Sequence, residues 1–135
     1  NPIPFEGSVF ISVNNSDKMD IIPLARDLNE MGFSLIATTG TAKELERNGL
    51  DVEHVFKVGE GRPNIVDEIK NGHINLVINT PMGARSRFDE EAIGCACIQY
   101  GILAITTLSG ANAILRAIRS KQKPLQMDSL QNYHA

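Results

Sequence analysis

The sequence lacks most of the features that mark metal-binding, membrane or nucleic-acid-binding proteins. It has two cysteines, Cys95 and Cys97, which cannot by themselves complete a four-ligand zinc site; we expect both to be reduced and largely buried. No apolar run approaches the ~20 residues that span a bilayer, and no stretch has the pattern of a signal peptide. The net charge of −3 provides no basic footprint for nucleic acid. We therefore expect no nucleic-acid or membrane partner, and a cytoplasmic location.

Catalytic motifs are also scarce. The glycine-rich stretch 59–62 lacks the Gly-Lys-Ser/Thr of a phosphate-binding P-loop, and is either a flap over a ligand or a simple turn. No nucleophile and base are evident as a pair. The three histidines, at positions 54, 73 and 134, are best interpreted as structural or surface residues. The sequence therefore predicts a binding module with no catalytic residues and no metal site.

What the sequence does contain is a regular alternation of short apolar, β-prone segments and amphipathic segments. This pattern predicts an α/β three-layer sandwich in which a five-stranded parallel sheet has helices on both faces. The first expected helix, 18–31, tolerates Pro23 if it begins near residue 20 or 21, because the proline then lies in its first turn. The expected strands are 8–13, 33–37, 52–56 (near an edge), 74–79 and 102–105, and the expected helices are 18–31, 43–49, 64–71, 85–100 and 111–120.

Three parts of the chain are expected to differ in organisation. Residues 1–7 are proline-rich and start without methionine, which suggests a linker from a preceding domain. Residues 8–120 carry all of the strand and helix patterns, so they form one domain. Residues 121–135 are polar and are expected to form a loosely held C-terminal tail.

The stretch Ala37-Thr38-Thr39-Gly40-Thr41-Ala42 stands out between a predicted strand and a predicted helix. Gly40 would let the backbone turn tightly and approach a ligand. Threonine hydroxyls and the free N–H groups of a helix start favour an anion. Two interpretations remain open here: the turn holds a phosphate, or Thr39 or Thr41 merely caps the helix.

The residues that follow all five predicted strands carry the same kinds of polar group. In a parallel sheet these ends share one edge, where ligands bind. They deliver hydroxyl, amide and ammonium groups, and no carboxylate follows any strand directly. This composition favours an anionic ligand such as a phosphorylated small molecule. The residues at the strand ends are Ser12, Asn14, Asn15, Lys18, Thr38, Thr39, Gly40, Thr41, Lys57, Asn79, Thr80, Thr106 and Thr107.

Several motifs occur in one order that resembles a known family. They include the threonine turn at 37–42, the run Glu60-Gly61-Arg62-Pro63-Asn64-Ile65, Lys70-Asn71-Gly72 and Val77-Ile78-Asn79-Thr80-Pro81. Over roughly residues 8–120 the sequence resembles the C-terminal regulatory domain of the carbamoyl-phosphate synthase large subunit, a methylglyoxal-synthase-like domain. The resemblance implies that fold and a site for nucleotide effectors, typically UMP or IMP. The effector-site residues it implies are Ser12, Lys18, Thr38, Thr41, Lys57, Asn79 and Thr80.

The resemblance also implies a larger enzyme around this domain. That enzyme makes carbamoyl phosphate from bicarbonate, glutamine-derived ammonia and ATP, for pyrimidine and arginine synthesis. Its ATP, Mg and K ions are expected only in catalytic domains that precede this one, and no cofactor is expected here. Expected partners are those preceding domains, the glutaminase small subunit, nucleotide effectors and, through the apolar positions of helix 85–100, further copies of the chain.

Two features leave alternatives open. After the fourth strand many relatives carry further basic residues, whereas here the run 82–85 is Met-Gly-Ala-Arg, so a contact from that turn and the identity of the effector are in question. A stand-alone methylglyoxal synthase acting on dihydroxyacetone phosphate would need a carboxylate base, for which Glu60 lies in an unsuitable pattern. The related domain of the bifunctional purine enzyme differs after the third strand.

Overall fold

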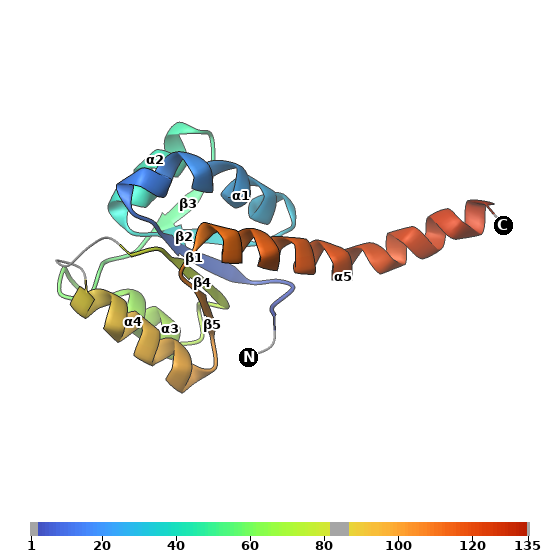
Figure 1. The fold of residues 1–135 in the computed structure, drawn as a ribbon. Helices are drawn as coiled ribbons and strands as arrows, with labels where there is room; N and C mark the ends of the chain where they lie inside the picture. Colours follow the sequence, from blue (N-terminus) through green and yellow to red (C-terminus); the bar gives the residue numbers. More distant parts are fainter. Residues whose placement is uncertain (1–2, 82–86, 135) are drawn as a thin grey trace.

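The computed structural model describes residues 3–81 and 87–134, with side chains as far as Lys121. Strands and helices alternate along nearly the whole chain (Figure 1). The elements are β1 (Ser8–Ser12), the short 3-10 helix η1 (Asn15–Asp17), α1 (Lys18–Glu30), β2 (Ser34–Ala37), α2 (Thr39–Arg47), β3 (Val52–His54), α3 (Ile65–Lys70), β4 (Leu76–Asn79), α4 (Arg87–Tyr100), β5 (Leu103–Ile105) and α5 (Leu108–His134).

The described strands form one five-stranded sheet in the order β3-β2-β1-β4-β5, with every neighbouring pair parallel. Central strand β1 pairs with β2 on one side and with β4 on the other. Strand β3 lies at an edge, as its alternating sequence predicted. The predicted parallel α/β architecture is confirmed. Its strand order places β1 where the chain switches from one side of the sheet to the other.

Two hydrophobic cores cover the two faces of this sheet because strand side chains alternate in direction. In β1, Val9 and Ile11 belong to the core beneath α1, α2 and α5. Phe10, between them, belongs to the core beneath α3 and α4. Figure 1 shows these two helix groups on opposite sides of the sheet. All three β1 residues are fully buried, so the strand that leads to the sheet's carboxyl edge is rigidly held.

Helix α1 begins at the first residue of the expected segment 18–31, and not near residue 20 or 21, the start that would suit Pro23. It starts at Lys18, so Pro23 lies inside the helix and not in its first turn. Proline at position 23 removes the N–H that would bond to the carbonyl of Met19. The Met19 residue is 78% exposed. Burial of Ile21, Leu24, Ala25 and Leu28 against the sheet outweighs the lost hydrogen bond.

Helix α5 is longer at both ends than the predicted 111–120. It begins at Leu108, where the Thr107 hydroxyl accepts a 3.0 Å hydrogen bond from the Gly110 N–H, and it extends to His134. The segment from Lys121 to His134 is therefore helical, and Figure 1 shows it reaching past the body of the fold.

The expectation that both cysteines are largely buried is confirmed for Cys97 and wrong for Cys95. Cys97 is buried in the core beneath α4, and burial raises the pKa of its thiol to about 11. Cys95, two positions earlier on the same helix, points to another face and is exposed.

No helix among residues 3–81 and 87–134 has both the length and the apolar character needed to cross a membrane.

Candidate ligand-binding site at the carboxyl edge of the sheet

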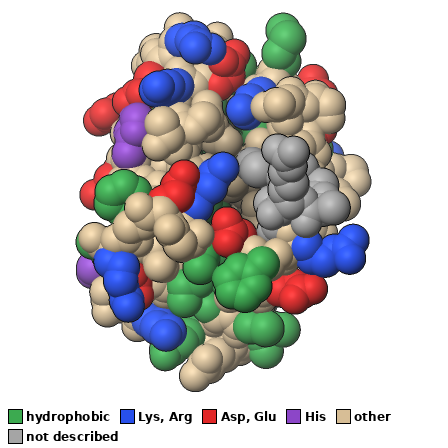
Figure 2. All heavy atoms as spheres, turned by 90° about the vertical axis from the view of Figure 1, so that its left-hand side faces the viewer, with side chains coloured by type: hydrophobic (Ala, Val, Ile, Leu, Met, Phe, Trp, Pro, Cys, Tyr) green, Lys and Arg blue, Asp and Glu red, His purple; other side chains and the backbone are tan. Residues whose placement is uncertain are grey.

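The carboxyl ends of β1 and β4 lie side by side at the topological switch of the sheet. Ser12 and Asn79 are register partners on these two strands. In open parallel sheets, ligands bind outside the strand ends at such a switch. The loops that connect β1 and β4 to the next elements are joined there by the Asn14 N–H, which donates to the Thr80 hydroxyl at 3.0 Å. Figure 2 looks at this side of the molecule and shows basic and acidic side chains near its centre.

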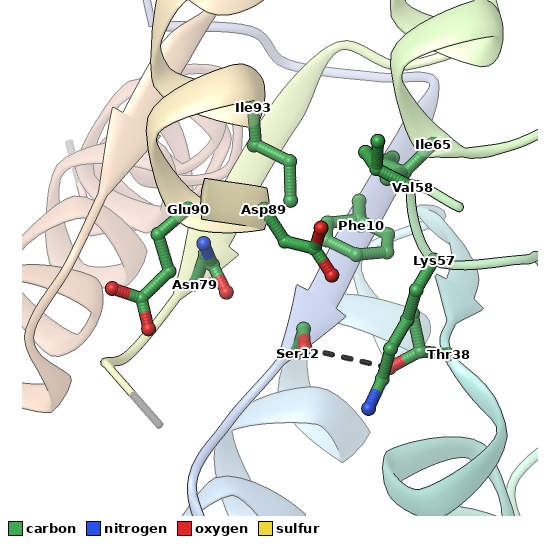
Figure 3. Close-up of a pocket in the computed structure, with 10 residues that line it drawn as sticks. All are labelled: Phe10, Ser12, Thr38, Lys57, Val58, Ile65, Asn79, Asp89, Glu90 and Ile93. Carbon is green, nitrogen blue, oxygen red and sulfur yellow. Dashed lines mark hydrogen bonds between the residues drawn. The ribbon is translucent and has the colours of Figure 1, made fainter. Parts of the chain in front are cut away.

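An inner pocket lies between β1, the loop after β3 and the start of α4 (Figure 3). It is narrow, about 30 Å³. The Ser12 and Thr38 hydroxyls line it and lie 3.4 Å apart, and both residues are buried. Its other lining residues are Phe10, Lys57, Val58, Ile65, Asn79, Asp89, Glu90 and Ile93.

An outer pocket of about 270 Å³ adjoins the inner one and shares Thr38 and Lys57 with it. It opens onto the N-terminus of α2. The remaining lining residues are Asn14, Asn15, Lys18, Gly40 and Thr41.

The start of α2 is not closed by a side-chain cap. Thr38 is the N-cap residue, yet its side chain makes no capping hydrogen bond. Thr39, Gly40 and Thr41 form the first helical turn, and the Thr41 hydroxyl accepts a 3.3 Å hydrogen bond from the Val13 N–H. The interpretation that Thr39 or Thr41 caps the helix is therefore wrong. N–H groups in a first helical turn have no acceptor within the helix, so those of α2 remain available at the edge of the outer pocket.

Gly40 has a different role from the one predicted. It lies within the helix and does not have a positive φ, so no tight turn depends on it. A Cβ atom added at this position would lie 3.3 Å from the Lys18 Nζ. The glycine thus leaves space for the Lys18 ammonium against the first turn of α2.

Positive charge therefore gathers at the outer pocket. The Lys18 ammonium lies beside the positive end of the α2 dipole, and Lys57 lines the same pocket. Within the part of the chain that the structure describes, neither lysine forms an ion pair. Like charges held together in this way favour an anion between them.

Of the strand-end residues, nine are the predicted ligand-binding residues: Ser12, Lys18, Thr38, Thr39, Gly40, Thr41, Lys57, Asn79 and Thr80. Seven of these nine line the two pockets, and two do not. Thr80 is 2% exposed and its hydroxyl is engaged with the Asn14 N–H. Thr39 lines a separate hollow beside β3, together with Glu53 and His54. The seven are Ser12, Lys18, Thr38, Gly40, Thr41, Lys57 and Asn79.

The sequence analysis missed two carboxylates at this edge. Asp89 and Glu90, in the first turn of α4, line the inner pocket. Burial raises the pKa of Asp89; Lys57 opposes this shift, and Glu60 and Glu90 add to it. No carboxylate directly follows any of the described strands, as expected, but the start of α4 brings two carboxylates to the same edge. The sequence did contain a signal for them, the acidic start of the helix that follows the fourth strand. A helix that follows a strand of a parallel sheet begins near the edge at which that strand ends.

The loop after β3 is held by its own contacts. The Glu60 carboxylate accepts a 2.8 Å hydrogen bond from the Lys57 N–H, so Glu60 is not one of the carboxylates lining the pockets. Arg62 donates to Asp67 at 2.6 and 3.2 Å, and this lowers the pKa of Asp67. Arg85 and the rest of the run 82–85 lie outside the described residues.

The histidines with described side chains are surface residues, as interpreted from the sequence. His54 contacts Glu46 at 3.0 Å and His73 contacts Glu68 at 3.0 Å, all away from the lysines of the outer pocket. Among the described residues no group of three or more His, Cys, Asp or Glu could hold a metal ion.

Comparison with known proteins gives consistent matches. The model of the family described as "MGS-like domain" matches residues 20–106. The carbamoyl phosphate synthase large chain of Archaeoglobus fulgidus is 46% identical over 134 residues, which cover 98% of this chain and 12% of that protein. The C-terminal section of the large chain of Aquifex aeolicus is 46% identical over 121 residues, 90% of this chain and 22% of that protein.

The fold has a solved counterpart. The crystal structure of methylglyoxal synthase from Elizabethkingia anophelis superposes with a TM-score of 0.67 at 20% sequence identity, covering 84% of this chain and 79% of that one. At this identity the likeness supports the fold alone. The chain spans about 12% of the length of the full-length curated relatives.

Proposed function

Because this chain belongs to the MGS-like domain family, we propose that it is the nucleotide-binding regulatory domain of a carbamoyl-phosphate synthase large subunit. The family and the similarity to the C-terminal section of such large chains agree with the resemblance drawn from the motifs. The regulatory role and the nucleotide ligand are the proposal.

One observation carries this proposal: the uncapped start of α2 lines the same outer pocket as Lys18 and Lys57. Free N–H groups, the helix dipole and two ammonium groups act together on the outer pocket. A phosphate monoester fits this chemistry, since its oxygens accept from N–H donors and its charge offsets that of the lysines.

At about 30 Å³ the inner pocket does not enclose a whole nucleoside, but its walls offer contacts to the uncharged part of such a ligand. The Asn79 amide can donate and accept, and Asp89 can accept from sugar hydroxyls. Phe10, Ile65 and Ile93 supply an apolar wall. These groups are compatible with UMP or IMP, with the phosphate at α2 and the ribose toward α4.

The wider setting is part of the same proposal. Residues 1–7 would connect to catalytic domains that bind ATP, Mg and K ions, and residues 121–135 would follow the domain at 8–120. The full enzyme would make carbamoyl phosphate for pyrimidine and arginine synthesis with a glutaminase small subunit, in the cytoplasm. This domain would carry no catalytic residue of that reaction.

One observation favours a second candidate function, the formation of methylglyoxal from dihydroxyacetone phosphate. That reaction needs a carboxylate base close to a phosphate site, and Asp89 lines the inner pocket whereas Glu60 does not. Incubation of the chain with dihydroxyacetone phosphate tests it directly. We expect no methylglyoxal above background; formation that is lost in Asp89→Asn would favour the lyase.

A thermal-shift titration with UMP, IMP and inorganic phosphate tests the regulatory proposal. A ligand at ~100 times its dissociation constant adds roughly 2.7 kcal/mol of stability. We expect a concentration-dependent shift with at least one nucleotide, and its loss in Lys57→Ala and in Thr38→Val. Lys43→Ala is the matched control, because Lys43 is exposed on α2 and lines neither pocket. No shift with either nucleotide, or an equal loss in the control, would contradict the proposal.

A further inference from the structure

The two adjoining pockets have opposite polarity. Lys18 and the open start of α2 make the outer pocket positive, whereas the Asp89 carboxylate brings negative charge to the inner pocket. The Glu90 carboxylate points away from that pocket (Figure 3). Lys57 lies at the boundary, since it lines both. A ligand that extends from α2 toward α4 therefore passes from a cationic to an anionic environment.

Asp89 defines the anionic end. Figure 3 shows its carboxylate pointing into the pocket, while the Lys57 ammonium points away from it, toward Thr38. The charged groups that act on Asp89 are Lys57 from the loop after β3, Glu60 from the same loop and Glu90 from α4. Two of these three are themselves acidic, and Asp89 is partly desolvated. This end of the site is therefore poorly suited to a second anion.

We propose that Asp89 excludes ligands that carry a second anionic group toward α4 while their phosphate is held at α2. The proposal rests on the proposed function, because it concerns which phosphorylated compounds enter that same site. The physical reason is like-charge repulsion in a partly desolvated pocket, which gives specificity by penalising the wrong ligand. Hydroxyl groups are accepted there because they donate to the carboxylate.

The test compares two ligands that differ only by a second phosphate on the ribose, the part that the proposal places toward α4. Uridine 5′-monophosphate and uridine 3′,5′-bisphosphate are titrated by calorimetry into the chain, and the inosine pair is treated in the same way. We expect the wild-type chain to bind the bisphosphate at least about tenfold more weakly. In Asp89→Asn, which keeps the side-chain size, this ratio falls to within about threefold. Glu91→Gln is the matched control, since Glu91 is exposed on α4 and lines neither pocket.

The outcomes separate this inference from the proposed function. An equal ratio in wild type and Asp89→Asn, or equal binding of both ligands by wild type, overturns the role of Asp89 while monophosphate binding upholds the nucleotide site. Binding of neither nucleotide overturns both. Should Asp89→Asn fail to fold, salt provides the second measurement on wild type. An electrostatic exclusion shrinks as sodium chloride rises, whereas a ratio that does not change with salt contradicts it.

Discussion

Helices α2 and α3 begin at the same edge of the sheet, yet their N-termini are built differently. At α3 the Asn64 side chain accepts from the Asp67 N–H and the Asp67 carboxylate accepts from the Asn64 N–H, which completes a capping box. Arg62 neutralises that carboxylate. At α2 the N-cap residue Thr38 makes no capping bond, and a lysine ammonium lies against the first turn.

The difference shows how to tell a structural helix start from a candidate site. A capped terminus has already satisfied its free N–H groups within the protein. An uncapped terminus flanked by cations has both donors and positive charge left for something outside the chain. The three predictions below alter the start of α2 or the start of α3 and compare the effects on ligand affinity and on stability.

The largest effect is expected from reversing the charge at α2. Lys18→Glu replaces the ammonium beside Gly40 with a carboxylate, which repels a phosphate at the helix start. We expect nucleotide affinity to fall by roughly 100-fold or more, since charged hydrogen bonds contribute about 1.5–3 kcal/mol and the new charge is repulsive. Calorimetric titration with the nucleotide that binds wild type measures this.

The reference for Lys18 is Lys70 in the last turn of α3. Lys70 is exposed and lines neither pocket of the site. Lys70→Glu makes the same charge change in the whole chain, so it should leave affinity within about twofold of wild type because distant surface charges are screened. A similar loss in both variants would mean that overall charge, and not the start of α2, controls binding.

Removal of the cap at α3 is expected to have a smaller effect of another kind. Asn64→Ala deletes the acceptor for the Asp67 N–H. Loss of an N-cap costs about 1 kcal/mol, so the free energy of unfolding in urea should fall by that amount while nucleotide affinity stays the same. Thr38 makes no such bond, and its replacement by Val should change binding more than stability. The reverse pattern would contradict the distinction between the two termini.

Much of the fold and of the candidate site could be predicted from the sequence. The features that could not be predicted have physical reasons. Alternating apolar segments predicted five parallel strands, and polar residues after each strand predicted the edge at which Ser12, Thr38 and Lys57 meet. The start of α2 was missed because Thr39 and Gly40 are weak helix formers. Tertiary contacts fix where α2 begins, because Thr41 is buried and its hydroxyl accepts a hydrogen bond from the Val13 N–H.

Other features depend on strand order, which local patterns do not contain. The pairing of Ser12 with Asn79 follows from β1 lying next to β4. Asp89 is ten residues after Asn79, and only the return of the chain into α4 brings it into the same pocket. Exposure of Cys95 likewise depends on which side of α4 packs on the sheet.

The smallest effect is expected from the ion pair that supports the α3 cap, and it depends on pH. Donation from Arg62 lowers the pKa of Asp67 below its ordinary value, and the Asn64 N–H adds to this. A depressed folded-state pKa stabilises the fold at neutral pH, and this contribution is lost as pH falls below about 4 and through the folded-state value. Arg62→Gln should therefore lower the urea midpoint slightly at pH 7, and the difference from wild type should vanish near pH 2. Arg62 is largely exposed, so salt should also reduce the difference. A difference that persists at pH 2 and in high salt would mean that Arg62 acts through packing and not through its charge on Asp67.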